Sequence, residues 1–349
     1  MPRFLNKDLK KIGVEITAED NTKQGVASAT RNLKGLESAL GGISSGLGII
    51  NKAQIGLGVG IAATSGLALR SYAALEKEAA AVGTLFTGTR ESIDARMEKV
   101  IETSKRLSYT NQQTATDFVK DFYNVQSGLA SQVSSIEGQE KILASSALLA
   151  AAGRGTLTDS TYALITATNA WNLGADEAEK SAANMFNTIR QGVLTLPDLT
   201  NVLNYMGGTA AQAGVEMEQA LTLTAAATTA GFDIQRVGSA LNSIIADSIS
   251  GNKRMQDLLK TMGLTNKEWK EIIDEDAIGA YSRLFDEMTK SGVEAGVLFG
   301  KEYGSLFAAL FQPENRDYLK EIFGTFGTGN VENLKQACLL YTSPSPRDS

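Results

Sequence analysis

One turn in the sequence combines a cation with backbone that could bind an anion. Arg154 lies between Gly153 and Gly155, and Asp159 follows where the next helix is expected to begin. A guanidinium presents several N–H donors in one plane and therefore suits a phosphate or a carboxylate. The alternative is an ordinary turn arginine, solvated at the surface and without a ligand.

Two further carboxylates, Glu216 and Glu218, lie at the expected start of a helix. Carboxylates at that position are stabilised by the positive end of the helix dipole. We therefore interpret this pair as structural rather than catalytic.

The residue inventory excludes several kinds of catalytic chemistry. The 349-residue chain contains no histidine and one cysteine, Cys338. Without histidine there can be no Ser-His-Asp triad, and a lone cysteine forms neither a disulfide within the chain nor a thiolate metal site. The glycines of residues 56–60 do not predict a dinucleotide loop, because no acidic partner or βαβ context follows. We expect no catalytic residue, no cofactor and no metal site, and hence a protein that is not an enzyme.

Composition indicates a folded, acidic protein. The chain is 43% hydrophobic and 21% charged, with a net charge of −6. Recognition of nucleic acid needs clustered Lys and Arg, so we expect no sequence-specific nucleic-acid binding. Residues 1–21 are polar and mixed, unlike a signal peptide, which favours synthesis in a bacterial cytoplasm.

Residues 196–245 carry the most regular pattern of the chain. Pro197 falls at an expected helix start, where its missing N–H costs no hydrogen bond. Apolar residues then recur at spacings of three and four, which predicts a buried helical face. That face consists of Leu199, Val202, Leu203 and Met206.

Glycines punctuate the rest of this segment. We expect Gly207 and Gly208 to end the first helix, and Gly214 and Gly231 to mark the next two turns. A third helix is expected to contain Gly238 and to bury the residues Val237, Leu241, Ile244 and Ile245.

The order of these elements is helix, GGTAAQAGV, alanine-rich helix, AGF and then VGSAL. This order resembles the core of tail tape measure proteins from long-tailed bacteriophages, over roughly residues 72–250. The residues that carry the resemblance are structural, namely Pro197, Gly207, Gly208, Gly214, Gly231 and Gly238.

The resemblance implies a structural protein of the virion tail that sets tail length while the tail tube assembles around it. The implied partners are tail-tube subunits, tail assembly chaperones and further copies of the chain, with transient insertion into the host inner membrane during DNA delivery. Two other functions stay open. One is a membrane-active helical protein of the pore-forming type, and the other is an enzymatic domain beyond this sequence.

The amino-terminal part predicts a short strand followed by a long helix. Ile12, Val14 and Ile16 alternate with other residues, which is typical of a strand. From Val26 to Ile61 apolar residues follow a heptad pattern, which predicts a coiled coil. The alternative is an amphipathic helix that lies on the globular core.

Residues 53–69 are uncharged and lie between Lys52 and Arg70. Their length is at the lower limit for crossing a membrane, and their glycines suit close helix contact. The alternative is a buried or self-associating helix in a water-soluble protein. The candidate membrane or self-association residues are Ile55, Gly56, Leu57, Gly58, Val59, Gly60, Ile61, Leu67 and Leu69.

Together these patterns predict an all-α fold, a multi-helix bundle with a long amino-terminal helical or coiled-coil segment and a short leading β-strand. Residues 110–168 and 195–246 share one order of helices and turns, which indicates a duplication. The aromatic residues within 303–311 are interpreted as core packing rather than a ligand site.

The predicted domains are a strand and lead-in (1–20), a heptad helix with the uncharged segment (21–70), a helical core (71–250) and additional helices (251–336). Residues 337–349 are set apart, because CLLYTSPSPRDS resembles translated transposon-end adaptor sequence. A genuine Pro/Ser-rich tail is the alternative. On the adaptor interpretation, the sequence is an amino-terminal piece of a longer protein.

Overall fold

The computed structural model describes residues 74–326 and 330–342, and these belong to one compact unit, Gly66–Ser349. The expected leading strand, the heptad helix and the uncharged segment 53–69 lie outside the described residues. Regular structure within the described residues is entirely helical, which confirms the all-α prediction for this part of the chain.

The described chain begins with a helix over residues 74–83. The helices that follow are α3 (Arg90–Thr110), α4 (Ala115–Leu129), α5 (Ile136–Ala152), α6 (Leu157–Trp171), the short η2 (Ala175–Glu177), α7 (Ala178–Gln191), α8 (Leu196–Ala213), α9 (Met217–Thr229) and α10 (Ile234–Ile249). The carboxyl-terminal part adds α11 (Lys253–Thr261), α12 (Asn266–Lys290), α13 (Ala295–Phe299), α14 (Lys301–Phe311), α15 (Pro313–Gly324) and α16 (Asn330–Thr342).

A shared sequence signal starts three of these helices. A threonine accepts the N3 backbone N–H while an aspartate three residues later binds the threonine N–H, at α4, α6 and α8. Such a capping box satisfies backbone donors that have no partner within the helix, and each cap contributes about 1 kcal/mol. The three boxes are Thr114 with Asp117, Thr156 with Asp159, and Thr195 with Asp198.

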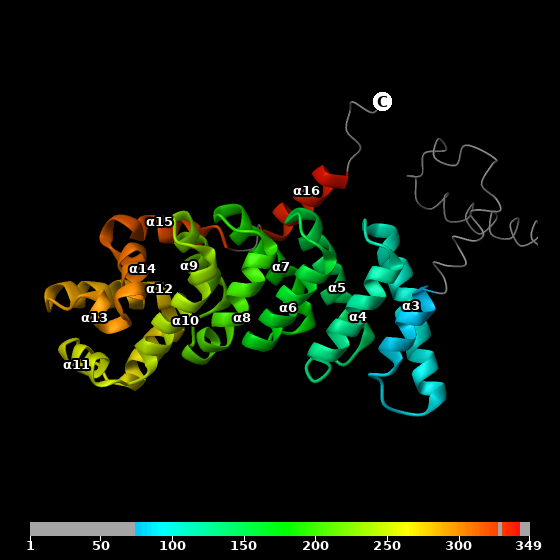
Figure 1. Cartoon of the computed structure of the whole chain (residues 1–349), viewed down its shortest axis with the longest axis horizontal. Helices are drawn as coiled ribbons and strands as arrows, with labels where there is room; N and C mark the ends of the chain where they lie inside the picture. The colour runs from blue at the N-terminus through cyan, green and yellow to red at the C-terminus, as the bar shows by residue number, and fades with distance from the viewer. Residues whose placement is uncertain (1–73, 327–329, 343–349) are drawn as a thin grey trace, which may run out of the picture. The chain divides into compact units, whose positions relative to one another are not determined.

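The helices from α4 to α10 form two layers. In the first layer α6 packs between α4 and α8, and α8 packs between α6 and α10; in the second, α7 packs between α5 and α9. Figure 1 shows these helices side by side in a row. Helix α16 returns to pack on α5 and α7, while α14 and α15 pack on α9. The second layer is therefore covered by the chain's own carboxyl-terminal helices.

The duplication is present, with a shorter period than the sequence suggested. First-layer helices begin at Ala115, Leu157, Leu196 and Ile234, roughly 40 residues apart, a spacing typical of stacked helix pairs. Residues 110–168 and 195–246 do contain equivalent helices, but α6, at the end of the first range, pairs with α7 as another copy of the same unit. Each copy is one helix from each layer.

The expectation that Gly207 and Gly208 end a helix is wrong. Helix α8 continues through both residues and ends at Gly214, whose φ of 87° is the left-handed conformation that glycine tolerates. Gly207 instead permits close packing, since a Cβ atom there would lie 3.2 Å from Ala170 of α6. Gly231, with φ 85°, marks the turn after α9 as expected.

Two hydrophobic cores meet at α8. Leu199 and Leu203 belong to the core that includes α3 to α7, whereas Val202 and Met206 belong to the core that extends through α15. All four residues of the predicted face are buried, and so are Val237, Leu241, Ile244 and Ile245 of α10. The second core runs from Val202 to Ile322 and so crosses residue 250 without interruption.

The aromatic residues near residue 307 are core residues, as expected. Phe307 and Phe311 are fully buried, with ring centroids 4.9 Å apart. Tyr281 lies edge-on to Phe307 and its hydroxyl is 3.0 Å from Ser248 Oγ. Burial raises the pKa of the Tyr281 phenol, so it stays neutral.

Two glycines of α8 and α10 allow a matched test of close packing. A Cβ at Gly208 meets no atom within 4 Å, whereas one at Gly238 lies 3.0 Å from the Val202 Cα. Gly208→Ala is expected to raise stability by about 0.5–1 kcal/mol through helix propensity. Gly238→Ala is expected to lower stability, because the α8 backbone must move apart from α10. Thermal unfolding followed by circular dichroism would contradict this account if both variants shifted Tm in the same direction.

Candidate functional site

The arginine turn does not assemble an anion site with Asp159. The Asp159 carboxylate accepts hydrogen bonds from the hydroxyl of Thr156 at 2.7 Å and from its backbone N–H at 3.4 Å. The Arg154 side chain is exposed, and its backbone has the left-handed conformation, with φ 55°. Because Asp159 is occupied in a helix cap, the structure favours the alternative of a solvated turn arginine.

Glu218 has a larger role than offsetting a helix dipole. Its carboxylate forms an ion pair with Lys180 at 2.7 Å and accepts a hydrogen bond from Asn184 Nδ2 at 3.1 Å. The hydrogen bond to Glu218 raises the pKa of Lys180 above its ordinary value. Glu218 therefore links α9 to α7, whereas Glu216 is the N-cap residue of α9. Local sequence could not reveal these partners, which lie one helix pair earlier in the chain.

Side-chain hydrogen bonds join neighbouring helices of the first layer. Between α4 and α6, Thr158 donates to Asp121 at 3.1 Å and Tyr162 donates to Asn124 at 3.3 Å. The equivalent bonds at the next two junctions are Thr166 to Asn204 at 2.9 Å and Thr209 to Asn242 at 2.5 Å. The sequence patterns do not predict these bonds, whose partners lie 33 to 38 residues apart.

Asp121 is a buried carboxylate in this set, 1% exposed. It accepts hydrogen bonds from Asn124 Nδ2 at 2.7 Å and from the Thr158 hydroxyl. Burial raises its pKa above the ordinary value, and the two hydrogen bonds offset only part of that effect. Asp121 therefore links α4 to α6, although burial of its charged carboxylate costs free energy.

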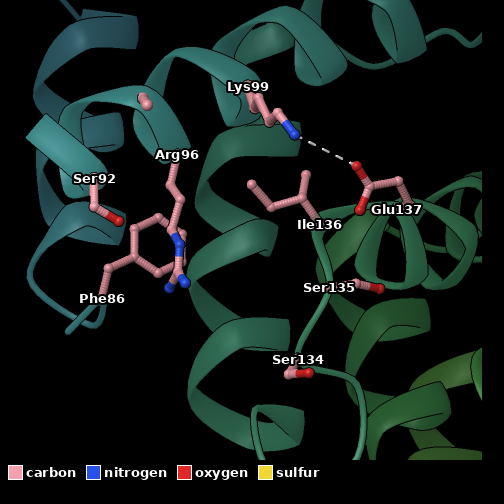
Figure 2. A pocket seen from close by; sticks show the side chains of 9 residues that line it. Phe86, Ser92, Arg96, Lys99, Ser134, Ser135, Ile136 and Glu137 are labelled. Carbon is pink, nitrogen blue, oxygen red and sulfur yellow. Dashed lines mark ion pairs between the residues drawn. The ribbon is translucent and has the colours of Figure 1, made fainter. Parts of the chain in front are cut away.

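One surface hollow lies where α3 meets the start of α5 (Figure 2). It has a volume of about 320 Å³ and is bordered by Phe86, Arg96, Lys99 and Ile136. The Arg96 guanidinium lies over the Phe86 ring at 5.5 Å, and Lys99 pairs with Glu137 at 3.7 Å. Both cations are thus engaged with neighbouring side chains, and the hollow contains no arrangement of nucleophile and base.

Cys338 lies on α16, is buried and donates to the Leu148 carbonyl oxygen at 3.1 Å. Burial raises the pKa of its thiol, which disfavours the reactive thiolate. The same helix is held to α7 by Asn330, which donates to Asn184 at 3.2 Å. That residues 337–349 derive from an adaptor remains a prediction.

Within residues 74–326 and 330–342, no group of three or more acidic or cysteine side chains is placed to hold a metal ion. Among the same residues, no helix combines the length and apolar character needed to cross a membrane.

Comparison with protein families matches residues 98–324 to the phage-related minor tail proteins. The chain belongs to this family. No curated protein and no solved structure matches the sequence.

The match to the minor tail protein family runs from within α3 to the end of α15. The match starts later than the segment 72–250 whose motifs resemble tape measure proteins, and it extends beyond residue 250 to include α11 to α15. Of the motif residues, Pro197 lies in the first turn of α8, and Gly238 provides the close contact between α8 and α10. A structural role in a phage tail follows from membership of the family.

The raised pKa of Asp121 predicts how stability depends on pH. The folded protein binds the Asp121 proton more tightly than the unfolded chain, so this residue makes the protein more stable as pH falls through the folded pKa. Asp121→Asn removes that dependence. Urea unfolding at pH 7 and pH 4.5 should show the wild type gaining stability relative to Asp121→Asn at the lower pH.

The control is Asp94→Asn on α3, whose carboxylate is exposed and pairs with Arg90. If the wild type instead loses stability relative to Asp121→Asn when the pH is lowered, the Asp121 pKa is not raised by burial and the account is wrong.

Proposed function

We propose that this minor tail protein is a tail tape measure protein, which sets tail length and templates assembly of the tail tube. The observation that carries the proposal is the family match over residues 98–324, because it includes the helices whose motif order resembles tape measure cores. The described residues form stacked helix pairs and bring together no catalytic group. This arrangement suits a scaffold better than a catalyst.

The measuring itself is assigned to the heptad segment rather than to the helix pairs. A helix extends about 1.5 Å per residue, so the length of an extended helical segment can determine the length of what assembles around it. Stacked helix pairs lack this property, since each pair folds back on itself and adds little length. In this proposal the helix pairs form a compact body at one end of the ruler.

The proposed partners are tail-tube subunits along the helical segment, tail assembly chaperones before assembly and further copies of the chain. The location is the virion tail after synthesis in the host cytoplasm. Because no enzymatic step belongs to this role, the chain is expected to leave purified peptidoglycan uncleaved.

A length change in the heptad segment tests the ruler. Duplicating residues 26–53 in the full-length gene adds four heptads and is expected to lengthen the tail by about 42 Å, from a rise of about 1.5 Å per residue. Tail length is measured on virions by negative-stain electron microscopy.

The control is a flexible insertion of the same length at Gly292, an exposed turn with φ 64° and no neighbour that a side chain would meet. This variant adds the same number of residues but no helical rise, so its tails should keep the wild-type length. Unchanged tails in the duplication variant, or equally lengthened tails in the control, would overturn the proposal.

We further propose that residues 53–69 enter the host membrane during DNA delivery. The support is compositional, because the stretch holds no charged side chain between Lys52 and Arg70. The full chain at micromolar concentration is expected to release dye from liposomes, and Val59→Glu is expected to abolish the release because it places a charge in the stretch. Release that persists undiminished in Val59→Glu, or no release from the wild type, counts against insertion.

A further inference from the structure

Helix α12 contains a break that its sequence does not require. Asp276 has an extended backbone, with φ −153° and ψ 89°, so the helix is bent between residues 266–275 and 277–290. Sharp bends in helices are usually found at proline or glycine, and neither lies within residues 270–278. The bend is therefore imposed by contacts in the folded chain rather than by the local sequence.

The apolar pattern of α12 runs through the break. Six of its buried residues follow one another at spacings of three and four, which is the pattern of one continuous helical face. They are Trp269, Ile273, Ala277, Tyr281, Leu284 and Met288. The same sequence can thus form a straight helix with the same apolar face.

Contact between two aromatic rings requires the bent form. The ring centroids of Trp269 and Tyr281 are 6.3 Å apart. Residues at this separation in a straight helix have Cα atoms about 18 Å apart, and helical side chains all lean toward the amino end, so the two rings could not meet. Both side chains also reach Ser248 of α10, where the indole donates to the carbonyl oxygen and the Tyr281 hydroxyl lies 3.0 Å from Oγ. These contacts exist only while α12 is bent.

Asp276 also stabilises the bent form alone. Its carboxylate accepts the Gly279 N–H at 2.9 Å, so it caps the second half of the helix. A cap residue needs a non-helical backbone, which Asp276 has only while α12 is bent. The first half meanwhile packs on the turn after α8, where a Cβ atom at Gly214 would lie 3.0 Å from the Asp274 Cα. Without the cap, the N–H groups at the break lose an acceptor that a straight helix would replace with its own carbonyl oxygens.

The second half of α12 is attached to α15. The Asp286 carboxylate accepts hydrogen bonds from two nitrogens of Arg316, at 2.6 and 2.9 Å, and Arg316 also donates to the Ser282 carbonyl oxygen at 3.2 Å. Helices α14 and α15 in turn pack on α9, whose residues 217–228 are buried apart from Glu218. A change in the direction of the second half therefore moves the helices that bury α9.

We propose that α12 is a two-state hinge, which the Asp276 cap keeps bent and the loss of that cap converts into one straight helix. In the straight form the second half carries α15 and the adjoining α14 away from α9. The body then opens on one side while the helix pairs from α4 to α7 stay folded. The hinge concerns the described helices alone and does not depend on whether the protein measures the tail.

The distance between the two ends of α12 tests the hinge. Nitroxide labels are placed in the full chain by Lys267→Cys and Lys290→Cys, with Cys338→Ser so that only these two sites react. A straight helix places the labelled residues about 34 Å apart, from a rise of about 1.5 Å per residue. Double electron–electron resonance should give a shorter distance in this background, and the distance should lengthen to the straight-helix value after Asp276→Ala.

A second variant removes the cap in a different way. A Cβ atom at Gly279 would collide with the Asp276 carboxylate, so Gly279→Ala displaces the cap while it favours helix. It should lengthen the distance as Asp276→Ala does. Hydrogen exchange supplies a second readout, because amides of residues 217–228 should exchange about tenfold faster in both variants once α9 is uncovered.

Two control variants keep the cap. Asp276→Asn retains an oxygen that can accept the Gly279 N–H. Glu275→Ala makes a similar change one residue earlier, at an exposed side chain with no partner among the described residues. Both should keep the starting distance, and circular dichroism establishes that each variant is folded.

The proposal is overturned if the folded cap variants keep the starting distance, or if Asp276→Asn lengthens it as much as Asp276→Ala. It is equally overturned if α12 straightens while exchange in residues 217–228 is unchanged, because α9 then stays covered. Neither result bears on tail length, since that test changes other residues.

Discussion

The structure depends on burying two sides of α8 at once. Leu199 and Leu203 point into one core while Val202 and Met206 point into the other, so a rotation of α8 would open both. The register is secured at the end of the helix, where the Trp171 indole of α6 donates to the Val215 carbonyl oxygen at 2.9 Å. Both cores share α8, and helices after residue 250 complete the second core, which extends to Ile322.

This constraint also accounts for the composition of the first layer. A helix buried on two sides exposes only a narrow strip, and in α8 that strip holds Asn201, Asn204, Tyr205 and Gly208. Small residues beneath the strip let the neighbouring helices approach closely, with Gly207 facing α6 and Gly238 facing the α8 backbone. Close approach in turn brings side chains such as Thr166 and Asn204 within hydrogen-bonding distance. The neutral exposed surface and the interhelical hydrogen bonds are thus consequences of one packing arrangement.

Much of this arrangement could be predicted from local pattern and some of it could not. Apolar spacing identified the buried face of α8 and the core role of Phe307, because helical periodicity is a local property. The error at Gly207 and Gly208 has a physical reason, since glycine serves both to end helices and to let helices pack closely, and the sequence alone does not distinguish these uses. The sequence around Glu218 indicates only a helix start, whereas its partners Lys180 and Asn184 lie one repeat away. The sequence pattern predicts the repeat at twice its period, because each of the ranges 110–168 and 195–246 contains three helices, one more than the helix pair that repeats.

The repeat also limits what the helix pairs can contribute to a tail. In a stack of helix pairs each unit contacts its neighbours, so stability is approximately a sum of local terms. In this chain the helix pairs are less independent of one another than that. Helix α16 packs on both α5 and α7, and α9 is enclosed by α7, α10, α14 and α15. Residues 217–228 are buried except for Glu218, whose side chain is 19% exposed and is paired with Lys180. Such a body gains rigidity from its carboxyl-terminal cover and cannot lengthen by adding one pair without rebuilding that cover. For the proposed measuring role, this packing favours a length-setting segment outside the described helix pairs, because residues added to the pairs would require this cover to be rebuilt.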